Sequence, residues 1–152
     1  MALTPNLPAD VARIIQLAVA PVFLLSGVGV TLGVFTNRLS RIVDRARALE
    51  QQLAHDAENP DLIKGLAVLA RRARYINAAI TLITLSALFI ALVVVMLFVN
   101  AFLRWDLAAF IAAMFILSML SLATALSSFL IEVRIATKSL RIGIEEASRQ
   151  DE

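Results

Sequence analysis

The chain has 152 residues, of which 60% are hydrophobic and only 17% are charged, and its mean hydropathy is +0.83. A soluble domain usually carries about half apolar and about a quarter charged residues, so this composition excludes an ordinary soluble protein. Fourteen Lys and Arg against 12 acidic residues give a net charge of +2, which is too small to predict nucleic-acid binding.

Three charge-free stretches, at residues 14–37, 75–103 and 107–131, are long enough to cross a membrane, since a spanning helix needs about 20 apolar residues. A soluble helical core is the alternative, but three such runs are hard to bury in so small a protein. We therefore predict an all-α membrane protein with three transmembrane helices, forming a single membrane domain over residues 1–152. The small residues Ala18 and Ala20 resemble a signal-cleavage site, but basic residues follow this apolar run instead of preceding it. We expect the first span to be retained.

The first span carries a face of small residues. Ser26, Gly29 and Gly33 share one side of a helix and include a GxxxG step, and they follow Pro21, which removes a backbone hydrogen bond. This pattern predicts close helix packing. A kinked hinge or a pore-lining glycine seam is the alternative.

Residues 38–74, between the first two spans, predict a cytoplasmic antiparallel coiled-coil hairpin. Apolar residues recur there at steps of three and four: Leu39, Ile42, Ala46, Leu49 and Leu53, then Leu62, Leu66, Leu69, Ala73 and Ile76. In the turn between the two helices, Asn59 is the expected N-cap and Pro60 the first helical residue, with Asp61 favourable in the first turn. No helix breaker separates either helix from its span.

The third span carries a stripe of hydroxyl side chains. At about 100° per residue, Ser121, Thr124 and Ser128 fall on one side of the helix, with Ser118 and Glu132 at its margins. Such hydroxyls often only join helices or bond to their own backbone. The alternative is a water-facing pore stripe, formed when several protomers bring this helix together around an axis.

Basic residues predict the orientation in the membrane. Of the 14 Lys and Arg, eight lie in residues 38–74 and four after residue 131, which leaves only Arg13 and Arg104 for the other face. Because Lys and Arg stay cytoplasmic, we expect the N-terminus outside and the hairpin and helical tail (132–152) in the cytoplasm, as in a multi-pass protein of the cell inner membrane. The short turn at Arg104–Asp106 then lies outside.

The basic cytoplasmic face has three possible roles. It can anchor helix ends at anionic lipid headgroups, recognise a phosphate or another anion, or pair with local acids such as Asp44 and Glu132. The residues that form this face are Arg38, Arg41, Arg45, Arg71, Arg72, Arg74, Arg134, Lys138 and Arg141.

The residues that membrane enzymes use are not found within the spans. The three spans contain no His, Asp, Glu, Lys or Arg, and the chain has no cysteine and no P-loop, dinucleotide or zinc-protease motif. Its one histidine, His55, falls in the hairpin turn, where an exposed loop residue is the simplest interpretation. We therefore predict no catalytic, metal-binding or cofactor-binding residue, and no enzyme activity.

Three segments carry a resemblance to a known family: residues 21–29 (PVFLLSGVG), 36–50 (TNRLSRIVDRARALE) and 71–80 (RRARYINAAI). Together they resemble uncharacterised bacterial membrane proteins grouped as domain of unknown function 2721. The resemblance implies a three-span bacterial inner-membrane protein and brings no activity or ligand.

The sequence favours a homo-oligomeric membrane protein with a channel-like or permeation role, because one protomer of three helices cannot enclose an aqueous path. The alternative is a non-conducting scaffold or adaptor whose hairpin binds a cytoplasmic protein partner or anionic lipid.

The orientation can be tested with single cysteines, since the chain has none of its own. Cysteines introduced at Asp56 or Glu58 should react with a membrane-impermeant thiol reagent only from the cytoplasmic side. A cysteine at Trp105 is the matched control and should react only from outside. Labelling of position 56 or 58 in intact cells would contradict the predicted topology.

Overall fold

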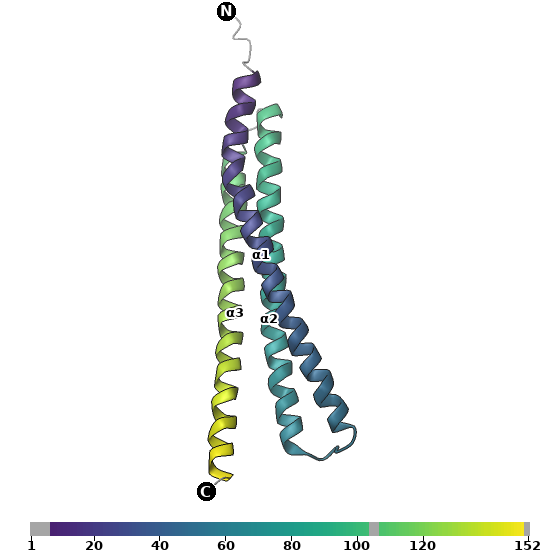
Figure 1. The fold of residues 1–152 in the computed structure, drawn as a ribbon. Coiled ribbons are helices and arrows are strands. Elements are labelled where there is room, and N and C mark those ends of the chain that lie inside the picture. The colour runs from purple at the N-terminus through teal and green to yellow at the C-terminus, as the bar shows by residue number, and fades with distance from the viewer. Residues whose placement is uncertain (1–6, 104–106, 151–152) are drawn as a thin grey trace, which may run out of the picture. The chain divides into compact units, whose positions relative to one another are not determined.

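The computed structural model describes residues 7–103 and 107–150, and the side chains of residues 11–100 and 107–137. The described chain consists of three helices (Figure 1), which are α1 (Leu7–Leu53), α2 (Pro60–Leu103) and α3 (Ala108–Gln150). All three are long and apolar enough to cross a membrane. The prediction of an all-α chain with three apolar helices is confirmed.

Each helix is more than twice as long as a membrane crossing requires. The helices have 47, 44 and 43 residues, against the roughly 20 that a bilayer demands. α1 passes through Pro21 without interruption, and α3 continues through Gly143, where the sequence carries a helix breaker. The predicted outer turn at Arg104–Asp106 lies outside the described residues.

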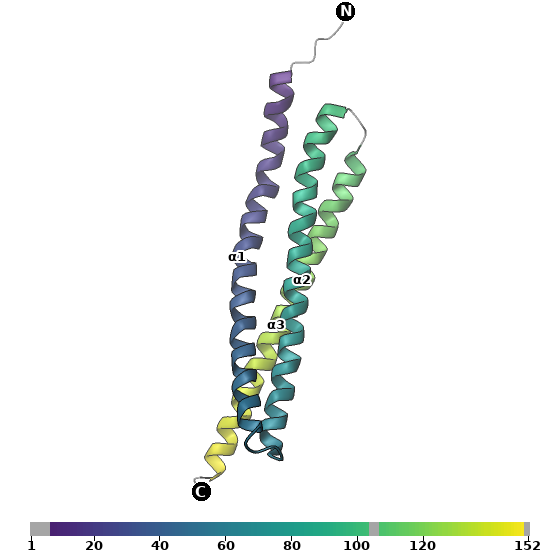
Figure 2. The same ribbon diagram turned by 90° about the vertical axis from the view of Figure 1, so that its right-hand side faces the viewer.

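The chain reverses direction between α1 and α2 (Figure 2), at residues 54–59. Asn59 is the N-cap of α2, because its Oδ1 accepts a hydrogen bond from the Asp61 N–H at 3.1 Å. Asn59 Nδ2 also donates to Asp56 Oδ2 at 3.0 Å. The helix begins at Pro60, which has no N–H that would lack a partner there. The predicted cap and helix start are confirmed.

The chain divides into two compact units. Unit 1 combines the residues up to Leu32 with Leu82–Ala123, and unit 2 combines Gly33–Thr81 with the residues from Thr124 onward. The sequence predicted one membrane domain. Every helix contributes one stretch to each unit. The boundary between the units therefore falls inside continuous helices, where the sequence has no linker that could mark it.

Unit 1 has the surface of a lipid-facing helix bundle. Small and branched apolar residues fill its interior, among them Ala18, Val28, Ile83 and Ile90. Large apolar side chains also point outward, and Phe23 is 75% exposed and Val30 is 73% exposed. Such a surface is unfavourable in water and is expected where the solvent is hydrocarbon.

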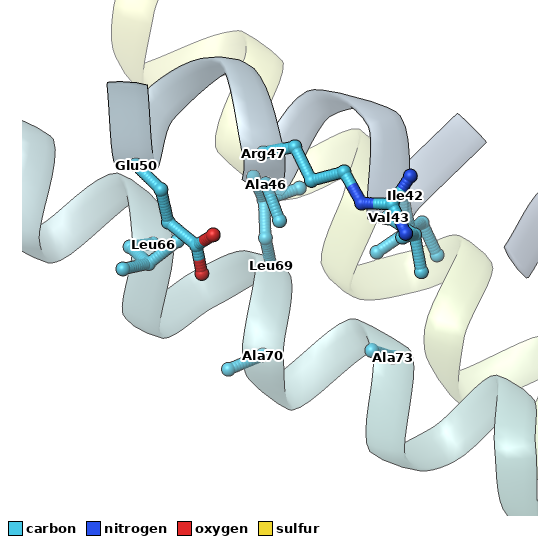
Figure 3. Close-up of a pocket in the computed structure, with 9 residues that line it drawn as sticks. All are labelled: Ile42, Val43, Ala46, Arg47, Glu50, Leu66, Leu69, Ala70 and Ala73. Carbon is cyan, nitrogen blue, oxygen red and sulfur yellow. The ribbon is translucent and has the colours of Figure 1, made fainter. Parts of the chain in front are cut away.

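In unit 2, α1 and α2 pack along the apolar seam predicted from the sequence. Ile42, Leu69 and Ile76 are buried, and a Cβ added at Gly65 would lie 3.4 Å from Leu49 Cδ1. Alanines leave a pocket of about 390 Å³ between the two helices (Figure 3), because Ala46, Ala70 and Ala73 are too short to fill it. The two helices therefore form an antiparallel pair, and coiled-coil geometry stays a prediction.

The small face of α1 makes no tight contact within the chain. Ser26, Gly29 and Gly33 are exposed, and a Cβ added at either glycine would meet nothing within 4 Å. Ser26 Oγ donates to the Val22 carbonyl of its own helix at 3.3 Å. The packing predicted for this face therefore concerns a contact outside the chain.

Because a side chain added at Gly29 or Gly33 meets nothing within the chain, substitutions there can test whether this face packs against another copy. If Gly29 and Gly33 pack against another copy, Gly29→Leu or Gly33→Leu should weaken association by about 1 to 3 kcal/mol, as in overpacked cores, while the protomer keeps its stability. Val30→Leu, on an exposed position beside Gly29, is the matched control. The measurement is the oligomer distribution in detergent. Equal distributions for all three variants would remove the packing role.

Candidate functional site

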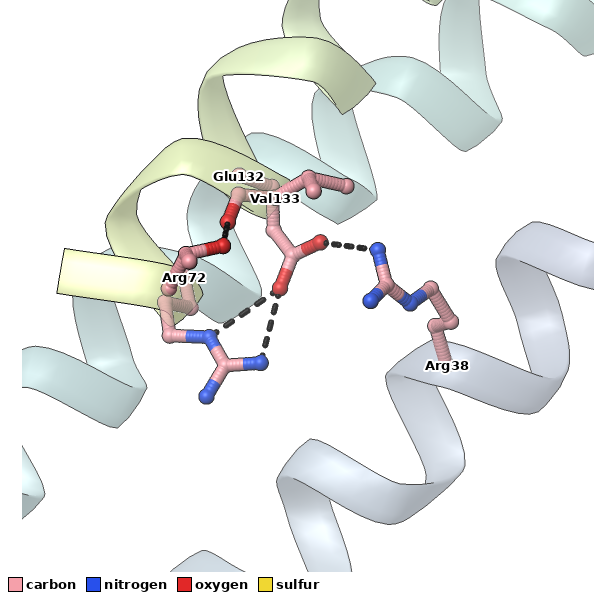
Figure 4. A network of polar contacts seen from close by, with 5 residues as sticks. Arg38, Arg72, Glu132 and Val133 are labelled. Carbon is pink, nitrogen blue, oxygen red and sulfur yellow. Dashed lines mark hydrogen bonds and ion pairs between the residues drawn. The ribbon is translucent and has the colours of Figure 1, made fainter. Parts of the chain in front are cut away.

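A buried carboxylate joins the three helices in unit 2. Glu132, on α3, has no exposed surface. Its Oε2 accepts a hydrogen bond from Arg38 Nη1 of α1 at 2.9 Å, and its Oε1 accepts two from Arg72 of α2, from Nε at 3.0 Å and Nη2 at 2.9 Å. Figure 4 shows the two guanidinium groups reaching the carboxylate from opposite sides. We call these three residues the Arg38–Glu132–Arg72 clamp.

The clamp follows from where the apolar runs end. Arg38 comes directly after the apolar stretch 14–37, Glu132 directly after 107–131, and Arg72 three residues before 75–103. Each helix continues past its apolar stretch without a break. Burying an ionised carboxylate costs several kcal/mol unless charge and hydrogen bonds compensate. Three charge-assisted hydrogen bonds from two cations supply that compensation here.

Aromatic packing holds the Arg38 side chain in place. Phe129 lies one helical turn before Glu132, and its ring stacks on Phe35 of α1 with centroids 4.6 Å apart and planes 24° apart. The Arg38 Cζ lies 5.1 Å from the centroid of Phe129, within the range of a cation–π interaction. The sequence analysis did not single out either phenylalanine. A periodicity that marks an apolar face does not reveal which rings meet.

Only some of the residues of the predicted basic face lie together in the structure. Four of its arginines line a hollow of about 330 Å³ between α1 and α2, together with Ile42 and Leu69. We call this the arginine hollow, and its arginines are Arg38, Arg41, Arg45 and Arg72. Arg71, Arg74 and Arg134 are exposed and do not line it. Lys138 and Arg141 lie beyond the residues whose side chains the structure describes.

Two residues of the hydroxyl stripe, Ser118 and Ser121, belong to unit 1 and face α2 of the same chain. Ser118 is buried, lies 3.0 Å from Ser86 Oγ and donates to the Ser86 carbonyl at 3.1 Å. Ser121 donates to the Leu82 carbonyl at 2.7 Å. Ser86, which with Thr84 is one of two hydroxyl residues inside the apolar run 82–99, was not predicted from the sequence. Its spacing from other hydroxyls gave no signal, because its partner is on another helix.

The part of the stripe in unit 2 is more open. Thr124 is exposed, and Ser128 is half-buried and donates to the Thr124 carbonyl of its own helix at 3.0 Å. Glu132, predicted at the margin of a possible pore, is instead held in the clamp. The structure thus divides the five residues into interhelical, intrahelical and ion-paired groups.

No cluster of three or more metal-ligating side chains occurs among the residues whose side chains are described. His55 Nδ1 lies 3.0 Å from the Gln51 carbonyl on an exposed turn. The described site therefore offers cationic and apolar groups, whose chemistry is ion pairing and anion binding.

A family model described as "Protein of unknown function (DUF2721)" matches residues 18–142. The match includes Arg38, Arg72 and Glu132. No curated protein and no solved structure matches the chain.

Removing either side of the clamp should destabilise the protein. Glu132→Gln leaves two guanidinium groups facing each other without a counter-charge, and breaking a buried ion pair costs about 3 to 5 kcal/mol. Asp44→Asn, at an exposed acid with no ion pair in the described residues, is the control and should change stability by less than about 0.5 kcal/mol.

The same comparison can be made on the cationic side. Arg72→Lys keeps the charge but loses the paired hydrogen bonds to one carboxylate oxygen, so it should be less stable than Arg74→Lys at an exposed neighbour. The free energy of unfolding, measured by reversible unfolding in detergent or lipid, gives the difference in stability for both pairs of variants. Equal stabilities for these two variants would show that the two hydrogen bonds from Arg72 to Glu132 Oε1 contribute nothing to stability.

Proposed function

The chain belongs to the DUF2721 family, whose model covers most of its length, and we propose that it is a non-conducting membrane scaffold or adaptor. Its three apolar helices make it an integral membrane protein. In this proposal the helices anchor the chain, and the hairpin formed by α1 and α2 in unit 2 binds a cytoplasmic protein partner or anionic lipid.

The proposed orientation rests on charge. The stretch that joins the first two apolar runs carries eight basic residues, and such stretches remain on the cytoplasmic side of bacterial inner membranes. This assigns the hairpin and the clamp to the cytoplasmic side and the N-terminus to the outside.

The observation that carries the proposal is the use of polar groups to tie helices together. Ser118 and Ser121 form hydrogen bonds to α2. The Glu132 carboxylate accepts hydrogen bonds from both Arg38 and Arg72. A permeation path requires polar groups that face water along an axis. Groups already satisfied within one chain support a rigid anchor more than a conduit.

The scaffold can also be a homo-oligomer. The exposed face formed by Ser26, Gly29 and Gly33 leaves room for close approach of another helix. Small residues at such positions allow backbones to come together in a membrane, where dispersion and weak hydrogen bonds drive association. This contact would multiply the number of hairpins presented to a partner.

A channel-like or permeation role is the second candidate. The observation in its favour is the surface of unit 2, where Thr124 and Arg134 are exposed and Ser128 is half-buried. Several copies arranged around α3 would direct these groups toward one axis. The scaffold is preferred because the buried part of the stripe already has partners.

One experiment separates the two candidates. Ser121 and Ser128 are changed to Ala and Thr124 to Val, which removes the three hydroxyls without adding volume to the buried Ser121 position. A scaffold predicts no ion flux from wild-type proteoliposomes and a loss of stability in the variant of about 0.6 kcal/mol for the interhelical bond of Ser121. A channel predicts wild-type flux that falls in the variant because a less polar path dewets.

The matched control replaces Thr31, Thr81 and Thr137 by Val, since each donates only to its own helix. Sustained wild-type flux under an ion gradient or voltage, reduced by the first triple variant but not by the second, would overturn the scaffold proposal. For the adaptor role, a photo-crosslinking residue at the exposed Val68 should give a discrete protein adduct in native membranes.

A further inference from the structure

We propose that the arginine hollow binds a phosphate group. The site is built from Arg38, Arg41 and Arg45 on α1 and Arg72 on α2. It deepens the scaffold proposal by naming the ligand class that the hairpin recognises, and it rests on that proposal only in placing the hairpin at a membrane surface.

The arrangement of the arginines follows from helix geometry. Arg38, Arg41 and Arg45 are spaced by three and four residues, so they project from one side of α1. Arg72 faces them from α2, which runs antiparallel to α1 in this unit. Ile42 and Leu69 form the apolar base between them, and Ile42 and Leu69 are both buried. The hollow is about 330 Å³, large enough for several water molecules or one hydrated anion.

The charges of the hollow are not balanced by the carboxylates whose side chains the structure describes. Among residues with described side chains, no carboxylate pairs with Arg41 or Arg45. Asp44, next to Arg45 in the sequence, accepts a hydrogen bond from Ser40 at 3.5 Å and does not line the hollow. Glu132 is therefore the one described carboxylate in contact with these four cations, and positive charge remains in excess.

Glu132 also prepares the site. It accepts two hydrogen bonds from Nε and Nη2 of Arg72, which orient that guanidinium group, and one from Nη1 of Arg38, whose guanidinium also lies over the Phe129 ring. Arg38 Nε and Nη2 and Arg72 Nη1 make no hydrogen bond to a described residue and remain available as donors. A site whose donors are already oriented loses less entropy when a ligand binds.

The chemistry of these donors selects phosphate. All four cations are arginines, whose planar fork matches the oxygens of a phosphate group and forms two parallel hydrogen bonds. The described lysine on the hairpin, Lys64, pairs instead with Asp61 at 3.5 Å. A general attraction to negative charge would not require one residue type on two helices.

A neighbouring hollow favours a lipid as the source of the phosphate. Arg38 and Arg41 also line a space of about 580 Å³ between α1 and α3, whose other walls include Val34, Phe129 and Val133. Val34 and Phe129 belong to the apolar stretches 14–37 and 107–131. A headgroup bound at the arginines would place an acyl chain beside these apolar residues. A free phosphate would use the arginine hollow alone.

The test uses the full chain in an uncharged detergent at about 0.15 M salt, where distant surface charges are screened. Three probes are titrated: phosphatidylglycerol, diacylglycerol, which has acyl chains but no phosphate, and inorganic phosphate. The apparent Kd is obtained from the ligand-dependent rise of the melting temperature. The variants are Arg41→Gln/Arg45→Gln and the charge-preserving Arg41→Lys/Arg45→Lys. The matched control is Arg47→Gln/Arg74→Gln, at two exposed arginines outside the hollow.

Both variants of positions 41 and 45 should weaken phosphatidylglycerol binding at least about tenfold, because each loses bidentate contacts, and the control should change it by less than about threefold. Binding of phosphatidylglycerol without inorganic phosphate identifies a lipid site. Similar binding of inorganic phosphate, with the same variant pattern, identifies a site for a soluble anion.

Three results would overturn the site: wild-type protein that binds diacylglycerol as well as phosphatidylglycerol and does not bind inorganic phosphate, equal losses in the Gln variants and the control, or full binding by the Lys variant. The Lys variant keeps the test valid if the Gln variant does not fold. Flux measurements on the same preparations report separately on the scaffold proposal, so failure of one is not failure of the other.

Discussion

The need to compensate one buried negative charge fixes much of unit 2. Glu132 is fully buried, and its two oxygens are held by guanidinium groups from two different helices. A carboxylate without those partners would be costly in this position, so the arrangement is stable only when α1, α2 and α3 are in register. The stacked rings of Phe35 and Phe129 support the same register from the apolar side. The arginine hollow exists because Arg38 and Arg72 are held there.

Different chemical groups hold the helices together in the two units. Unit 1 joins α2 and α3 through serine hydroxyls and two backbone carbonyls, which are small, uncharged and suited to hydrocarbon surroundings. Unit 2 uses an ion pair, which is tolerated where water and headgroups can stabilise the exposed parts of its arginines. This division matches the sequence, in which every charge of the hairpin and of α3 lies outside the three apolar stretches.

Much of the fold could be predicted because it depends on local and periodic signals. Apolar length gives the helices, the Asn59-Pro60-Asp61 segment gives the turn, and steps of three and four give the seam through Ile42 and Leu69. Neighbours across helices could not be predicted, since periodicity defines a face but not what it meets. Ser121 was therefore open to two interpretations, Ser86 was overlooked, and pairing of Glu132 was one of three alternatives for the basic face. The hollow depends on packing of α1 against α2, which a single sequence does not reveal.

Arg72 and Glu132 are expected to stabilise the protein through their contact with each other. A double-mutant cycle measures this directly, using the unfolding free energies of wild type, Arg72→Gln, Glu132→Gln and the combined variant in the same detergent. Paired residues of this kind show coupling of about 1 to 3 kcal/mol. We predict that the combined variant loses less unfolding free energy than the two single variants lose together, by at least about 1 kcal/mol. Additive losses would contradict it, because they would mean that each side chain acts through other contacts.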